Sequence, residues 1–447
     1  MRGMSFLTVL ALAVSVPASA ETAAAAPEVL TLDEAVALAL RQNRSLASAA
    51  MSVDRAEQKI GVARARRLPS LDFQGLAGTT LTPIRVTFPA GSFGTFPATG
   101  PIPSQDSVIE APRSLSGNVN LSVSQPLSQL HRIGLNTKLS ELSRDLEQER
   151  LRESRTEIAA EVRRLYYSLL QSESMLRAKL EQVRVYRELD RLVGEQVRVE
   201  VALRSESLGV KARLASEEYG LTTLQGDIST AKEKMNLLLG RELDQDFTVA
   251  AVPDTRLEEV DLRTAMATAL ERRPDLAQAR LAVEQADTDL RMKKAERIPD
   301  VSLGVSVVSF INVDLVPRTI AQAGLQVKWE PFDWGRRGKE RAEKTIQVEQ
   351  AKLSAREARD RARLEVGERF RKLQEARLLV EAQQLSRDAA DEKLRVSMSK
   401  NRYEANLIKD VLDAQASMSA AHSDYDRALL TFWTAKADFQ KAIGQEQ

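Results

Sequence analysis

Two halves of this sequence repeat each other, and the repeat constrains the fold more than any other feature. Residues 31–71 align without a gap on residues 261–301, at a constant offset of 230. Residues 161–240 match residues 365–444, where the offset is 204. A repeat of about 200 residues is far longer than a solenoid unit, so we interpret it as an internal two-fold repeat of one structural half. The change of offset places about 26 extra residues between Gly75 and Asn118.

The first twenty residues have the three parts of a secretory signal. Arg2 is positively charged, residues 6–16 are apolar, and Ala18-Ser19-Ala20 forms a small-residue cleavage site. We therefore predict a signal peptide over residues 1–20, with a frayed N-terminal helix as the alternative. After it, no apolar run approaches the roughly 20 residues of a membrane helix, so this chain can cross a membrane only as β-strands closed into a barrel.

Composition excludes several classes of protein. The chain has no cysteine, so disulfides and thiolate metal sites are absent. Lys and Arg number 64 against 63 Asp and Glu, and this balance does not predict a nucleic-acid partner. The two histidines, His131 and His422, are isolated, whereas a metal site needs clustered ligands. We find no catalytic set and no phosphate-binding loop, and we predict neither an enzyme nor a cofactor.

Proline placement predicts two long helical regions. None of the 15 prolines lies between Pro126 and Pro253, and none follows Pro331. Both regions are rich in good helix formers, and proline breaks helix interiors. Leucine and valine recur there at spacings of three, four and seven residues, as in a long amphipathic helix. A helix over residues 134–198 would be roughly 100 Å long, which indicates coiled-coil packing.

Each long region is expected to fold back once as a helical hairpin. The first turn is placed at residues 201–204, with Ser205 as N-cap of the returning helix. The second is placed at residues 405–407, where Asn406 can adopt a left-handed conformation. Gly240 and Gly444 are expected to cap the ends of the returning helices.

Four short segments alternate apolar and polar residues with a period of two, which is the pattern of a two-faced strand. They begin at Leu71, Asn118, Val301 and Gly324. In a membrane barrel the apolar face contacts lipid and the polar face lines the lumen. Aromatic residues gather beside these segments, as in interfacial girdles, although a soluble two-hairpin sheet with an aromatic core is the alternative. The 26-residue excess, rich in proline and glycine, is expected to be a surface loop outside the cell.

Four strands are too few to close a barrel. An open edge would leave unpaired backbone groups in hydrocarbon. The chain must therefore oligomerise, and a trimer supplies about 12 strands, which is within the range of known barrels.

Several motifs together make the chain resemble the TolC-like outer-membrane efflux proteins. They are Leu32-Asp33-Glu34-Ala35 with its echo at Leu262, Arg67-Leu68-Pro69-Ser70-Leu71 with Arg297-Ile298-Pro299-Asp300-Val301, the run Leu325 to Gly335, and Arg402-Tyr403-Glu404-Ala405 followed by Asp410-Val411-Leu412-Asp413-Ala414-Gln415. The resemblance covers essentially the whole mature chain.

The resemblance implies an α+β membrane protein. Its expected architecture is a trimeric 12-stranded β-barrel in the outer membrane, with four strands per chain, continuous with a long periplasmic α-helical coiled-coil barrel. Its expected function is the exit duct of a tripartite efflux or type I secretion system, a passive conduit and not an enzyme. Its expected partners are two further copies, a periplasmic adaptor, an inner-membrane pump and outer-membrane lipid. A periplasmic coiled-coil adaptor or scaffold is the alternative.

Expected boundaries follow the repeat. The first half covers residues 21–240, with a β-hairpin at about 70–127 and a helical hairpin at about 134–240. Residues 241–260 form an equatorial linker, and residues 247–252 with the chain ends form a mixed region. The second half covers residues 261–447, with a β-hairpin at about 300–332 and a helical hairpin at about 336–444.

The resemblance also implies site residues at the hairpin tips. Asp410 and Asp413 are expected to point into the pore, Tyr403 to hold the closed tip, and Glu206 to add an acidic group from the first half. The residues expected to contact the adaptor are Ala202, Leu203, Arg204, Asn406 and Leu407. The alternative is that both aspartates are solvated residues at a helix start. The run Arg336-Arg337-Gly338-Lys339 has two interpretations, contact with lipid phosphates or a solvated helix start.

Overall fold

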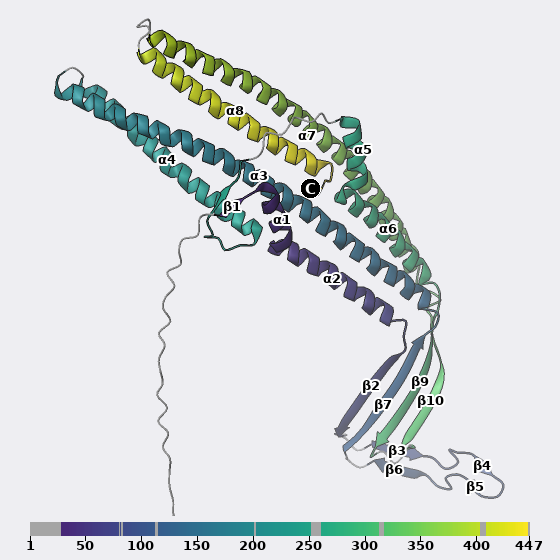
Figure 1. Cartoon of the computed structure of the whole chain (residues 1–447). Helices are drawn as coiled ribbons and strands as arrows, with labels where there is room; N and C mark the ends of the chain where they lie inside the picture. The colour runs from purple at the N-terminus through teal and green to yellow at the C-terminus, as the bar shows by residue number, and fades with distance from the viewer. Residues whose placement is uncertain are drawn as a thin grey trace, which may run out of the picture. The chain divides into compact units, whose positions relative to one another are not determined.

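The structure is a computed structural model that describes residues 28–79, 81, 84–111, 115–200, 203–251, 261–312, 317–402 and 408–445 (Figure 1). The predicted signal peptide, residues 1–20, lies outside these ranges. The chain forms two compact units. The first comprises Met1–Arg41, Val162–Arg256 and Leu385–Leu430, and the second comprises Gln42–Glu161, Leu257–Gln384 and Thr431–Gln447.

The described residues form eight helices. They are α1 (Leu32–Gln42), α2 (Arg44–Ala65), α3 (Leu130–Arg198), α4 (Arg204–Leu239), α5 (Leu262–Arg272), α6 (Pro274–Ala295), α7 (Arg336–Arg402) and α8 (Ile408–Ala442). The long helices α3 and α7 have 69 and 67 residues, or roughly 100 Å each at 1.5 Å per residue. Within the described ranges, no helix is both long enough and apolar enough to span a membrane.

The ends of these helices test the predicted caps. Gly240 and Gly444 both have left-handed backbone, with φ of 73° and 75°, as predicted for helix ends. The prediction of Ser205 as N-cap of α4 is wrong, because the helix already begins at Arg204 and Leu203 is its N-cap. Leucine has no side-chain acceptor, so the carboxylate of Glu206 compensates by accepting the backbone N–H of Leu203 at 3.2 Å. Helix α3 begins at Leu130, four residues before the predicted start.

All four alternating segments form strands of one antiparallel sheet in the second unit. The strands are β2 (Ser70–Thr79), β7 (Leu115–Pro126), β9 (Asp300–Ile311) and β10 (Thr319–Lys328), in the order β10-β9-β7-β2. In Figure 1 they lie side by side. The two hairpins, β2 with β7 and β9 with β10, meet where β7 pairs with β9. Each strand has 10 to 12 residues, enough to cross a hydrocarbon layer when tilted.

The expected surface loop between β2 and β7 contains more secondary structure than predicted. Strand β3 (Ile84–Phe88) pairs with β6 (Ser107–Ala111), and β4 (Thr95–Phe96) pairs with β5 (Gly100–Pro101). Backbone hydrogen bonds continue between the two pairs, from Phe93 N–H to Ile102 C=O and from Ile102 N–H to Gly94 C=O, both 2.9 Å long. Gly91 and Gly94, which precede β4, have positive φ of 81° and 100°, whereas Gly100 and Pro101 are themselves the residues of β5.

Helices of the second unit follow the same order as its strands. Glu57 of α2 pairs with Arg144 of α3. Lys138 of α3 pairs with Glu284 of α6. Lys293 of α6 pairs with Glu340 of α7 at 2.8 Å. These contacts give the order α2-α3-α6-α7, which matches β2-β7-β9-β10. Each strand therefore has the same place in the order of the sheet as its counterpart helix has in the order of the helices.

The first unit contains a small parallel sheet that joins two distant segments. Strand β1 (Glu28–Leu30) pairs with β8 (Phe247–Val249), which lies within residues 247–252, the segment predicted as mixed and equatorial. The Tyr166 hydroxyl, on α3, lies 2.9 Å from the carbonyl oxygen of Leu30 and 2.7 Å from that of Ala250. The Tyr166 side chain is buried among them. Arg241 reinforces the junction through an ion pair with Glu28.

Candidate channel-forming site

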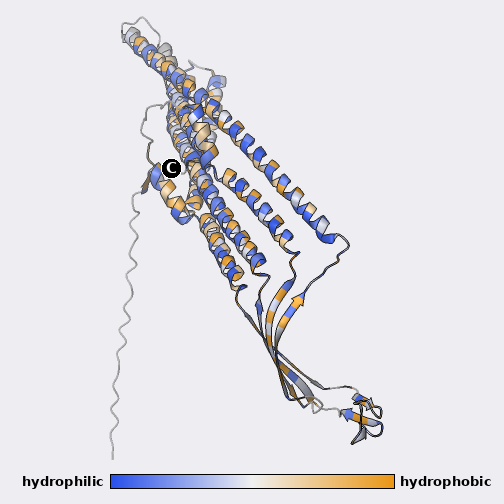
Figure 2. Cartoon of the chain, turned by 90° about the vertical axis from the view of Figure 1, so that its right-hand side faces the viewer, coloured by the Kyte–Doolittle hydropathy of each residue, from blue (hydrophilic) through white to orange (hydrophobic). Residues whose placement is uncertain are grey.

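The register of the sheet separates an apolar face from a polar face. Residues directly opposite each other on paired strands lie on the same face. One row across the four strands joins Leu71, Val123, Val305 and Ala323, and the next apolar row joins Phe73, Leu121, Val307 and Ala321. The intervening row joins Asp72, Ser122, Ser306 and Gln322. Figure 2 shows this alternation along the strands. Sequence alternation predicted the two faces of each strand, and the register now aligns them.

The apolar face and both edges of this sheet are open within the described chain. Strands β2 and β10 each pair with one neighbour only, so each presents a free backbone edge. The apolar face is uncovered, since Leu71 and Phe73 are 68% and 71% exposed. Soluble proteins rarely expose an apolar surface of this kind or leave long flat edges unpaired. The sheet thus combines an exposed apolar face with two unpaired backbone edges.

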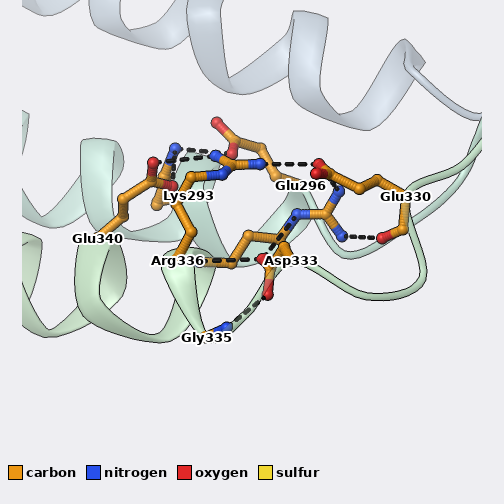
Figure 3. A network of polar contacts seen from close by, with 8 residues as sticks. Lys293, Glu296, Glu330, Asp333, Gly335, Arg336 and Glu340 are labelled. Carbon is orange, nitrogen blue, oxygen red and sulfur yellow. Dashed lines mark hydrogen bonds and ion pairs between the residues drawn. The ribbon is translucent and has the colours of Figure 1, made fainter.

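An ion-pair network, the junction network, fixes the passage from β10 into α7 (Figure 3). The Glu330 carboxylate pairs with Arg336 at 2.8 Å and with Arg337 at 3.2 Å. Arg336 also pairs with Glu340 at 3.0 Å, and Glu340 in turn binds Lys293 of α6. Both arginines are therefore occupied by carboxylates of their own chain. This arrangement favours the helix-start interpretation of the run at Arg336 over contact with lipid phosphates.

Asp333 caps the first turn of α7 in the same network. Its carboxylate accepts the backbone N–H groups of Arg337, at 3.0 Å, and Gly335, at 3.1 Å. The hydrogen bond from the Arg337 N–H is the largest cause that holds the pKa of Asp333 below its usual value. The Gly335 N–H and the charges of the two arginines act in the same direction. Asp333 thus stays ionised where helix start and linker meet. The sequence motifs did not predict that Asp333 caps this helix.

Three exposed aromatic side chains surround the same junction. Trp329, Phe332 and Trp334 are all exposed, and the rings of Phe332 and Trp334 lie 4.9 Å apart, edge to face. The backbone of Trp334 is left-handed, with φ of 56°, and so is that of Gly335, with φ of 84°. A bulky residue adopts this conformation rarely. The Trp334 side chain is 90% exposed at this turn.

The preceding strand-to-helix passage, from β7 into α3, is held by hydrogen bonds to the second half of the chain. The Ser128 hydroxyl donates to the carbonyl oxygen of Pro299 at 2.6 Å and accepts the N–H of Val301 at 2.8 Å. Arg132 pairs with Asp300 at 3.0 Å. These contacts join residues more than 160 positions apart, so no local sequence pattern could have revealed them.

The tip of the first hairpin is only partly described. Leu203, Arg204 and Glu206 are exposed at the start of α4. Glu206 is the capping carboxylate already described, which is a structural role that the prediction did not include. Ala202 lies outside the described residues. Exposure agrees with an adaptor contact for Leu203 and Arg204, and that contact stays a prediction.

The tip of the second hairpin carries most of the predicted site. Tyr403, Asn406 and Leu407 lie outside the described residues. Asp410 is in the first turn of α8 and Asp413 in the second, and the side chains of both lie outside what the structure describes. The pore constriction therefore stays a prediction, with the helical backbone of both aspartates established.

The two histidines have separate surroundings. His422 of α8 lies 2.8 Å from the Asp391 carboxylate of α7, and His131 is exposed near the start of α3. Over the described ranges, no three or more His, Asp or Glu side chains are grouped so that they could hold a metal ion.

Comparison with known proteins now adds the family. The family model for outer membrane efflux proteins matches residues 35–241 and 265–445, which together make up most of the chain. The chain belongs to the outer membrane efflux protein family. It is accordingly an outer-membrane protein that serves as an exit duct for efflux, and the adaptor or scaffold alternative is set aside. Comparison with curated proteins finds no match.

Solved structures with the same fold are also outer-membrane proteins. The fold is similar to that of the Campylobacter jejuni CmeC outer membrane channel, with a TM-score of 0.73 and 15% identity over 92% of this chain and 85% of that one. It is similar to the open state of the Neisseria gonorrhoeae MtrE outer membrane channel, with a TM-score of 0.70 and 18% identity over 93% and 89%. It is similar to the outer membrane protein VceC from Vibrio cholerae, with a TM-score of 0.69 and 16% identity over 93% and 96%.

Proposed function

We propose that three copies of this chain form one continuous duct from the periplasm to the exterior. The observation that carries this proposal is the four-stranded sheet with one apolar face, one polar face and two unpaired edges. Joining β10 of one copy to β2 of the next satisfies both edges, and three copies give a closed barrel of 12 strands. The apolar rows then face lipid and the polar rows face the lumen.

The helices extend the same duct into the periplasm. Since α2-α3-α6-α7 has the order of the strands, the joint between copies continues from sheet to helices as α7 beside α2. Helices α3 and α7 with α4 and α8 form the helical hairpins of an α-helical barrel. Residues 21–240 and 261–447 are the two structural repeats of each copy, joined by residues 241–260. A signal peptide at residues 1–20 delivers the chain to this compartment.

The partners of the duct are an inner-membrane pump and a periplasmic adaptor. The adaptor contacts the exposed hairpin tips, including Leu203 and Arg204. Carboxylates of Asp410, Asp413 and Glu206 from three copies surround the periplasmic entrance, with Tyr403 holding the closed tip. A ring of acidic groups in a narrow passage favours cations.

Oligomeric state and conductance test the proposal together. Full-length protein in detergent is expected to give the mass of three copies by native mass spectrometry. The same sample in a planar bilayer is expected to form ion-conducting channels. A monomer that forms no channel would contradict the duct, whereas a trimer without conductance would leave the assembly correct and reject its open passage.

A further inference from the structure

The ribbon between β2 and β7, residues 84–111, has a composition unlike the rest of the chain. We call this segment the arm. Three of its residues are charged, namely Arg85, Asp106 and Glu110, although charged residues make up 28% of the whole sequence. Arg85 and Glu110 form an ion pair with each other, and Asp106 accepts the backbone N–H of Ala90 at 2.8 Å. The arm therefore offers little charge to a partner.

The arm is a two-faced ribbon. Val86 is opposite Ile109 and Phe88 is opposite Ser107, so these residues share one face. The ring of Phe93 lies 5.3 Å from that of Phe88 and extends this apolar surface. Arg85 and Glu110, with Thr87 and Val108, occupy the other face. Phe93 is 61% exposed and Ile109 is 45% exposed.

The apolar face of such a ribbon needs a partner surface to pack against. A two-stranded hairpin is marginally stable in water unless its apolar face packs against something. An anionic lipid surface attracts Lys and Arg, but the arm has no lysine and its one arginine is already paired. An uncharged, apolar counterpart therefore fits the arm better than a lipid headgroup layer does.

We infer that the arm binds the same arm of the neighbouring copies, so that three arms meet in one apolar cluster over the outer opening of the duct. This inference rests on the proposed trimer. Each copy brings one arm, and the arm continues β2, the edge strand at which copies join. The connection of the other hairpin, from Ile311 of β9 to Thr319 of β10, is much shorter in sequence than the arm.

Cysteine cross-linking tests the contact directly, because the natural chain has no cysteine. Phe93→Cys places a single thiol on the apolar face, and Thr87→Cys places one on the opposite face of the same ribbon as the matched control. A short bis-maleimide is added to assembled full-length protein in outer membranes. Phe93→Cys is expected to give covalent dimers, since one thiol per copy can link only two of three copies, with roughly tenfold less from Thr87→Cys because a closed symmetry brings equivalent faces together.

Other outcomes are decisive in different ways. If Phe93→Cys stays monomeric on denaturing gels while native mass spectrometry shows three copies, the arms do not meet and the inference is wrong. If the three-copy mass is itself missing, the proposed duct has failed instead. A nitroxide on Phe93→Cys that is relaxed by lipid-dissolved oxygen would place the arm in lipid and also overturn the inference. Ile109→Cys, on the same face of the ribbon as Phe88, repeats the test if Phe93→Cys does not assemble.

Charge gives an independent readout on the same position. Three carboxylates from Phe93→Asp would repel one another at close range and open the cluster. The comparison is made in a chain that also carries Asp410→Ala and Asp413→Ala, so that the periplasmic entrance does not limit the current. In that background Phe93→Asp is expected to raise single-channel conductance about twofold or more, while Thr87→Asp leaves it unchanged. Equal conductance with and without Phe93→Asp would count against a cluster over the opening.

Discussion

At the residue scale, Tyr166 shows how one side chain holds two distant segments. Its hydroxyl shares its hydrogen between the carbonyl oxygens of Leu30 and Ala250, at the carboxyl ends of the two strands of the small parallel sheet. Burial raises the pKa of Tyr166 to about 12, against the smaller opposing effect of its backbone hydrogen bond. The repeat aligns Tyr166 with Phe370, which has no hydroxyl, so this contact belongs to the first half alone.

Removing that hydroxyl is expected to destabilise the first unit. Tyr166→Phe keeps the ring but deletes the hydrogen bond, at a cost of about 1 kcal/mol. Faster amide hydrogen exchange at residues 28–30 and 247–249 is the measurement, with α6 as an internal reference. Unchanged exchange at both segments would show that backbone pairing alone holds them.

The same tyrosine sets an alkaline pH dependence. The folded pKa lies above the unfolded value of about 10, so the unfolded chain loses this proton first as pH rises. The stabilisation is complete below pH 10 and is lost as pH rises toward about 12. The stability gap between the parent and Tyr166→Phe is therefore expected to close across this window in thermal melts. A gap that stays constant would contradict the assignment.

The residue scale is also where the sequence was least informative about the site. The run at Arg336 left two interpretations open although Glu340 follows Arg336 by four residues, the spacing of an ion pair on one face of a helix. The other counter-ion, Glu330, lies before the linker and becomes a neighbour only when the chain turns at Trp334. The Lys293 contribution comes from another helix and depends on how α6 meets α7. Such contacts depend on tertiary packing, and no spacing along the chain encodes them.

At the element scale, the alternating strands were predictable because a period of two directly reports a two-faced sheet. The long helices were predictable for a similar reason, since proline-free runs of good helix formers have few other options. The pairing of β7 with β9 was not, because it joins the two halves of the chain. The arm was predicted as a loop, and its proline and glycine content concealed the short register of β3 with β6.

Adjacent residues of β9 give a matched test of the two faces. Val305→Asp places a carboxylate on the apolar face, at a cost of up to about 2 kcal/mol in a bilayer, whereas Ser306→Asp places it on the polar face beside Ser122. We expect Val305→Asp to abolish recovery in the outer-membrane fraction and Ser306→Asp to be recovered like the parent. The reverse pattern, or equal recovery, would mean that the faces are assigned wrongly.

At the scale of the whole molecule, the tip of the second hairpin is expected to control the passage of ions. The sequence resemblance supplied Asp410 and Asp413, and the structure adds that both lie on the first two turns of α8. The pore-facing role depends on how three copies surround an axis. A single chain cannot display that arrangement, and this is why the site could be predicted only by resemblance.

Substitution of both aspartates tests the constriction. Asp410→Ala combined with Asp413→Ala removes six carboxylates from a trimer. We expect a higher single-channel conductance or a weaker preference for cations in planar bilayers, because the ring of like charges is gone. Asp424→Ala, a change of the same kind further along α8, is the control. Currents equal to those of the parent would reject the constriction and support the solvated helix-start alternative.

The matching order of strands and helices in the second unit has a consequence for how copies recognise each other. When the sheet edge of one copy pairs with that of the next, the helix edges of the two copies are aligned at the same time. A single pairing event therefore positions the whole interface between copies. A substitution that disrupts the sheet edge must then also weaken the contact between helices, and the reverse. A copy with one disrupted edge could still bind a neighbour through its intact edge, but it would prevent the ring from closing. Co-expression of such a copy with the parent should therefore be dominant-negative, reducing the number of closed trimers by more than its share of the total protein.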